Sequence, residues 1–254
     1  MIRSGAETET RGIALPNGPR ATGEEKIGEE QMVDPQSGAE GAGPGEAAAV
    51  MHGLGVSAFQ SGKVEAALRF ISRACTHPEA PAVWHRDHAE ILDRCGNSEA
   101  AEAAARLALS RDPNYAAAWE TLGTILVQRG DHAGSCACYE KAVEIEPNFV
   151  QALNNLAVSL DRLGRPKAAE ARYRQVLRLV PQSPEIQLNF ATLLGELGNY
   201  REALAIVREV IDRYPNLMRA HSIAAEFKRK SIKRTPVRRN PKRPPVDLEK
   251  KKTR

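Results

Sequence analysis

Residues 116–149 read AAAWETLGTILVQRGDHAGSCACYEKAVEIEPNF, and this stretch decides the fold. Apolar residues recur at helical spacing in two segments, 116–128 and 132–145, so each segment predicts an amphipathic helix. Gly130 separates the two segments, where a tight turn needs a residue that tolerates a positive φ. Pro147 follows the second segment, and proline cannot continue a helical hydrogen-bond ladder. The stretch therefore predicts one helix–turn–helix unit.

The same pattern recurs every 34 residues along most of the chain. Glycine fills one column of the repeat, although glycine makes up only 19 of the 254 residues: Gly62, Gly96, Gly130, Gly164 and Gly198. A second column holds small residues: Ala67, Ala101, Ser135, Ala169 and Ala203. A third column holds proline: Pro113, Pro147, Pro181 and Pro215. A fixed period of this length indicates a stack of similar units that bury a continuous core.

The unit resembles the tetratricopeptide repeat (TPR), whose signature it matches at Trp119, Leu122, Gly123, Ser135, Tyr139, Ala142 and Pro147. The resemblance covers five units: 48–81, 82–115, 116–149, 150–183 and 184–217. It implies an all-α, right-handed superhelical solenoid. A sixth unit begins at Met218 and stops near Lys230, which predicts either a capping helix or a truncated unit over 218–230. The second unit departs from the pattern, because His85 and His88 stand where bulky apolar residues are usual.

Charge is distributed unevenly along the chain, whose net charge is +4. Residues 1–47 are acidic and rich in Gly and Glu, and residues 231–254 combine proline with many basic residues, so both segments are predicted to be disordered. The basic tail predicts weak, salt-sensitive and non-specific contact with polyanions. The sequence contains no apolar run long enough for a membrane span and no signal-peptide core, so we expect a cytoplasmic protein.

The sequence offers little for catalysis or metal binding. Cys136 and Cys138 are two residues apart on a predicted helix, so their side chains point to different faces and do not form half of a zinc site. His85 and His88 could share a metal, but a third ligand at suitable spacing is missing, and packing substitution explains both better. We therefore expect no catalytic residues, no metal and no cofactor.

The family resemblance places the first helix of each unit on the concave side of the superhelix. The candidate groove residues there are Arg86, Asp87, Glu90, Asp93, Glu120, Thr121, Thr124, Gln128, Asn154, Asn155, Arg162, Asn189 and Thr192. Amide, hydroxyl and charged groups of this kind can hydrogen-bond the backbone of an extended peptide without dictating its sequence. The resemblance thus implies a protein or peptide ligand, whereas the sequence leaves the oligomeric state open.

Two subtypes of the family were compared with this groove. Arrays that clamp the C-terminal carboxylate of chaperones need lysines and asparagines where this chain has His52, Val56 and Asp87, so that subtype is disfavoured. Arrays that precede the catalytic half of protein O-GlcNAc transferases carry an asparagine ladder, which Asn155 and Asn189 match. The leading hypothesis is a non-enzymatic interaction scaffold. The alternatives are the substrate-recognition part of a truncated O-GlcNAc-transferase-like glycosyltransferase, and a nucleic-acid-associated protein that acts through its tail.

Overall fold

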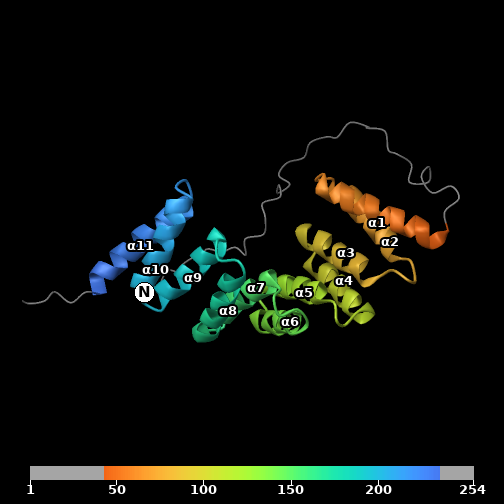
Figure 1. Ribbon diagram of the computed structural model, residues 1–254. Coiled ribbons are helices and arrows are strands. Elements are labelled where there is room, and N and C mark those ends of the chain that lie inside the picture. Colours follow the sequence, from red (N-terminus) through yellow and green to blue (C-terminus); the bar gives the residue numbers. More distant parts are fainter. Residues whose placement is uncertain (1–42, 235–254) are drawn as a thin grey trace, which may run out of the picture.

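The computed structural model describes residues 43–234, and within that range the chain contains helices and no strand (Figure 1). The helices are α1 (Pro44–Gln60), α2 (Val64–Cys75), α3 (Ala82–Arg94), α4 (Ser98–Arg111), α5 (Ala116–Gln128), α6 (His132–Ile145), α7 (Val150–Arg162), α8 (Pro166–Leu179), α9 (Pro184–Glu196), α10 (Tyr200–Arg213) and α11 (Met218–Arg234). They follow one another along an elongated array, with α1 and α11 at its two ends (Figure 1). The all-α solenoid predicted from the repeat is confirmed.

Each unit is a helical hairpin with a glycine at its turn. All five glycines of the repeat column have positive φ, between 70° and 81°. This left-handed conformation is costly for residues with a Cβ atom, which explains why the column is glycine. At two of these turns the next helix is also capped by a side chain, since Asn97 accepts from the Ala100 amide (3.3 Å) and Asp131 from the Gly134 amide (2.8 Å).

The small residues of the repeat let the two helices of a unit approach closely. Gly123 on α5 lies directly against the ring of Tyr139 on α6, which is fully buried. Ser135, the one polar residue in a column that is otherwise alanine, is also fully buried. Cys136 and Cys138 are both buried but belong to different hydrophobic clusters, as expected from their two-residue spacing on α6.

The helices form two layers with different spacing. The first helices of successive units (α1, α3, α5, α7 and α9) and α11 each contact the next, and we call them the inner layer. Among residues 43–234, the second helices of successive units (α2, α4, α6, α8 and α10) never bring their Cα atoms within 8 Å of one another. A stack whose layers differ in spacing curves toward the closer one, so the inner layer lies on the concave side.

The ends of the array differ from the predicted boundaries. Helix α1 begins at Pro44, four residues before the predicted start of the first unit at residue 48. Residues 44–47 are helical, with proline in the first turn where its missing N–H costs nothing. Helix α11 extends to Arg234, four residues beyond the predicted end at 230, and a Lys230–Glu226 ion pair (2.6 Å) supports its last turns. The remaining segments predicted to be disordered, 1–42 and 235–254, lie outside the described residues.

The two histidines of the second unit occupy different environments. His85 is buried in α3, and its Nε2 atom has no hydrogen-bond partner. His88 is partly exposed and contacts Ser72 of α2 through its Nε2 atom (3.1 Å). Burial lowers the pKa of both imidazoles, so each is held in its neutral form. Both side chains serve packing between helices.

Candidate functional site

Polar side chains on the inner layer join successive units. Four hydrogen bonds of this kind are His52 Nε2 to Asp87 Oδ2 (2.8 Å), Gln128 Nε2 to Asp93 Oδ2 (2.6 Å), Asn155 Nδ2 to Glu120 Oε1 (2.8 Å) and Arg219 Nη2 to Asn189 Oδ1 (2.7 Å). In three of the four pairs the partners are 35 residues apart, one repeat plus one position. These bonds fix the orientation of the groove side chains before any ligand arrives.

The groove residues predicted in the second unit form one cluster on α3. Arg86 pairs with Asp87 (2.8 Å) and with Glu90 (3.0 Å), and His52 of α1 reaches the same Asp87 while stacking on the Trp84 ring (centroids 5.2 Å apart). Burial alone would lower the pKa of Arg86, but Asp87 and other neighbours outweigh it and raise that pKa. Arg86 therefore stays charged, and the cluster holds acidic and basic side chains next to each other.

A second cluster joins the third and fourth units. Glu120 accepts hydrogen bonds from Thr124 (3.1 Å) and from Asn155 (2.8 Å), and the Thr124 hydroxyl also contacts the buried Tyr139 hydroxyl (3.2 Å). Burial raises the pKa of Glu120, while the two hydrogen bonds lower it to a smaller extent. Asn155 is only 7% exposed, so its main contact is Glu120, and the neighbouring Asn154 is the more accessible amide.

The remaining predicted residues are more dispersed. Asn189 uses its carbonyl oxygen to accept from Arg219 of α11, which leaves its amide N–H groups to donate. The Thr121 and Thr192 hydroxyls donate to carbonyl oxygens of their own helices, at 2.9 and 2.8 Å. Arg162 is exposed at the end of α7. The structure thus gathers six of the predicted residues into two clusters, and the others are dispersed, with Asn189 near the C-terminal end.

Sequence reasoning missed two members of this row, His52 and Arg219. Each belongs to a first-helix position of a terminal unit, where the repeat pattern is weakest. The 35-residue offset between the partners of one pair, once seen at Glu120 and Asn155, would have pointed from Asp87 to His52. Arg219 pairs at an offset of 30, which the repeat does not predict.

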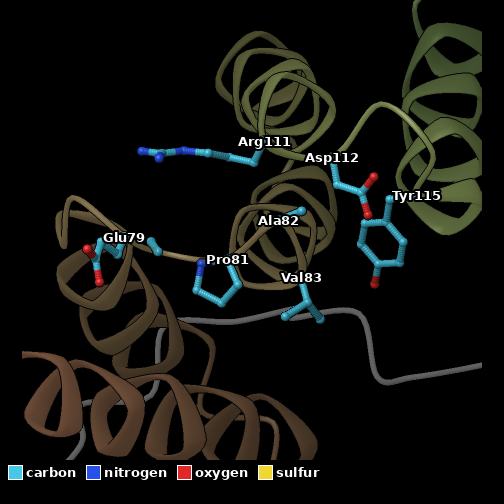
Figure 2. A pocket seen from close by; sticks show the side chains of 8 residues that line it. Glu79, Pro81, Ala82, Val83, Arg111, Asp112 and Tyr115 are labelled. Carbon is cyan, nitrogen blue, oxygen red and sulfur yellow. The ribbon is translucent and has the colours of Figure 1, made fainter.

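An open pocket lies at the rim of the array, beside the α2–α3 and α4–α5 connections. It measures about 540 Å³ and is lined by Glu79, Ala80, Pro81, Ala82, Val83, Arg111, Asp112 and Tyr115. Figure 2 shows Pro81 and Val83 between the charged Glu79 and Arg111 on one side and Tyr115 on the other. Such a surface can accept an apolar side chain next to a polar backbone.

Within residues 43–234, no three histidine, cysteine, aspartate or glutamate side chains are grouped to hold a metal ion. In the same part of the chain, no helix has both the length and the apolar character needed to cross a membrane. All four cysteines have free thiols, and burial raises the pKa of Cys75 and of Cys138 to about 11. These two thiols are therefore protonated and weakly nucleophilic at neutral pH.

Comparison with known protein families settles the family. Models of the tetratricopeptide repeat match residues 87–115, 114–182 and 162–226. The chain belongs to the tetratricopeptide repeat family. Proteins of this family are generally non-catalytic scaffolds for protein–protein interaction, and the TPR array described above has the same architecture. No curated protein matches this TPR chain in sequence.

Solved structures agree with the fold. A TPR protein from Parabacteroides merdae has a TM-score of 0.65 at 18% identity and covers 73% of this chain and 74% of its own. A thermophilic TPR protein of Thermus thermophilus has a TM-score of 0.57 at 21% identity, covering 71% and 98%. YrrB, described as a TPR protein with an unusual peptide-binding site, has a TM-score of 0.56 at 22% identity, covering 65% and 85%. At these identities the likeness concerns the fold alone.

Proposed function

We propose that this TPR protein is a non-enzymatic scaffold that binds a polypeptide segment along the inner layer. The observation that carries the proposal is the row of polar side chains joined from unit to unit along α1, α3, α5 and α7, and again between α9 and α11. Because these bonds orient the side chains in advance, a ligand loses less side-chain entropy on binding. A cytoplasmic location, expected from the sequence, is part of the same proposal.

The groove would recognise mainly the ligand backbone. Amide groups such as those of Asn154 and Asn189 can donate to peptide carbonyl oxygens, at a net gain of about 0.5–1.5 kcal/mol for each bond. The cluster of Arg86, Asp87 and Glu90 carries both signs of charge, which favours a ligand with mixed rather than purely acidic or basic side chains. The similarity in fold to YrrB, whose described site binds peptide, supports the same class of ligand.

The test is peptide selection on the full chain followed by affinity measurement. Peptides selected from a random library by the wild-type protein are measured by fluorescence anisotropy against a variant carrying Asn154→Ala and Asn189→Ala. Loss of one hydrogen bond at each site weakens binding by roughly 5- to 150-fold in total. Asn155 is left unchanged, because removing its amide would take away one of the two side-chain donors of the partly buried Glu120 carboxylate and would perturb the fold.

The matched control carries Asn148→Ala and Asn216→Ala, which remove two exposed asparagines from loops. This control variant is expected to bind the selected peptides like the wild type. Circular dichroism melting verifies that both variants keep the helical array. Equal affinity of the groove variant and the wild type would refute binding through the inner layer, and so would failure of the wild type to select any peptide.

A further inference from the structure

The outer face of α1 carries apolar side chains that nothing in residues 43–234 covers. Val50 is 41% exposed and Leu54 is 44% exposed, one helical turn apart on the same face. The exposed residues Ala49, Gly53 and Ser57 complete this surface, which we call the α1 end face. Glu46, in the first turn of α1, is its nearest charged neighbour on that helix.

The repeat shows what the same positions do in the other units. The column of Val50 continues with Trp84, which is partly exposed, and then with Ala118, Ala152, Ile186 and Ala220, which are at most 7% exposed. The column of Leu54 continues with His88, which is partly exposed, and then with Leu122, Leu156, Phe190 and Ala224, which are at most 6% exposed. Val50 and Leu54 therefore occupy positions that belong to the core from the third unit onward and that are uncovered on α1.

In the later units these positions are covered by the second helix of the preceding unit. His88, in the column of Leu54, contacts Ser72 of α2 (3.1 Å). Phe190, in the same column, packs on Tyr173 of α8 (ring centroids 5.8 Å apart). The surface of Leu54 is thus shaped to receive a helix, and continuing the array would place a helix there.

The opposite end of the array has a different character. Most of the α11 face that corresponds to the buried Leu188, Ala191 and Leu194 of α9 is polar. The matching residues on α11 are Ser222, Ala225 and Lys228, and all three are exposed. Terminal repeats normally need a polar outer face for solubility. The α11 end meets that requirement, and the α1 end face does not.

Gly53 is a second, independent feature of the α1 end face. It lies inside a helix, where glycine costs about 1 kcal/mol relative to alanine. Gly55 and Gly123 have an internal reason, since a Cβ atom there would collide with Ile71 or Tyr139. No atom lies within 4 Å of a Cβ placed at Gly53, so the monomer gives no reason for this glycine. A glycine at an exposed helix surface permits close approach of another backbone.

We infer that the α1 end face binds the same face of a second copy of this chain. Gly53 lies next to the midpoint of α1 (Pro44–Gln60), so a two-fold axis at that point would bring the two glycines together and let the helices approach closely. Val50 and Leu54 of each protomer then cover those of the other. The face carries no charge between Ala49 and Ser57, so self-association brings no like charges together. The predicted groove residues of α3, α5, α7 and α9 lie outside the α1 end face.

The test is the mass of the full chain in solution without any peptide. Sedimentation velocity from about 1 μM to about 1 mM is expected to show a shift from 27.7 kDa toward twice that mass, with a dissociation constant on the order of 10–100 μM, as for small interfaces. Leu54→Glu is expected to raise this constant at least about tenfold, because each dimer contains the substitution twice. Ser222→Glu, exposed on α11, is the matched control and leaves the constant unchanged.

Two more samples identify the partner surface. Gly53→Gln fills space that is empty in the monomer, so it leaves helicity intact and weakens the dimer. An equimolar mixture of Leu54→Glu and Leu54→Lys protomers is expected to restore dimerisation if each face meets its own copy. A wild-type chain that stays monomeric throughout, a dimer insensitive to Leu54→Glu, or no recovery in the mixture would each overturn the proposal.

Discussion

Replacing Gly123 by alanine tests how tightly the two helices of a unit pack. A Cβ atom at this position would lie 2.6 Å from Cε1 and 2.9 Å from Cδ1 of Tyr139. The Tyr139 ring is fully buried, and its hydroxyl lies 3.2 Å from the Thr124 hydroxyl. The ring can move away only by disturbing the core and that hydrogen bond. Gly123→Ala therefore sets overpacking against the better helix propensity of alanine.

The two effects have different sizes. Overpacking a core costs about 1–3 kcal/mol, whereas alanine in a helix gains about 1 kcal/mol over glycine. We expect Gly123→Ala to lower the free energy of unfolding by roughly 1 kcal/mol. Gly53→Ala is the matched control, because that position is also helical but its Cβ has no neighbour within 4 Å. The control is expected to gain about 1 kcal/mol, so the two variants differ by about 2 kcal/mol.

Urea unfolding followed by circular dichroism measures both variants, at a protein concentration low enough to keep the chain monomeric. The comparison depends on the difference between two variants of the same chain, which is robust to incomplete cooperativity in a repeat array. If Gly123→Ala stabilises the protein as much as Gly53→Ala does, the close contact between Gly123 and Tyr139 does not limit packing, and the reasoning is refuted.

Three further predictions concern single residues. Burial lowers the pKa of His85 below 6.5, so unfolding takes up a proton below that pH. The urea midpoint should therefore decrease as the pH is lowered from about 8 to about 5.5, and His85→Leu should make this decrease smaller. Gly130→Ala should lower the free energy of unfolding by about 1–2 kcal/mol, because alanine is strained at a φ of +81°. A urea midpoint equal to that of the wild type would contradict this. Asp131→Ala should lower the stability measured in a thermal melt by about 1 kcal/mol, because it removes the acceptor for the Gly134 amide, whereas Asp131→Asn should keep most of that stability.

Local features of the fold could be predicted from sequence because each depends on a short stretch of chain. The turn at Gly130 follows from the conformational freedom of glycine, and α5 and α6 have the bounds expected from their apolar spacing. The separation of Cys136 from Cys138 follows from helix geometry. The start of α1 at Pro44 was missed, because the first residues of the helix, 44–47, lack the apolar periodicity that marks a helix.

The arrangement of the groove could be predicted only in part. The repeat placed Asn155 and Glu120 on the inner layer, but their hydrogen bond depends on how far successive units rotate, which the sequence does not state. That rotation turns Asn155 from an expected ligand contact into a nearly buried partner of Glu120. The binding role of Asn154 and Asn189 stays a prediction that the peptide experiment tests.

The unequal spacing of the two layers has a mechanical consequence. Successive first helices contact one another along the inner layer. Successive second helices are separated at the backbone and are bridged by long side chains such as Arg174, which pairs with Glu202 (3.1 Å). Bending that opens the array about the inner layer separates neighbouring second helices, and the surface ion pairs between them cost about 1 kcal/mol or less each to break. A ligand long enough to contact both α3 and α9 would therefore set the curvature of the whole array, so that its contacts at one end would affect its binding at the other.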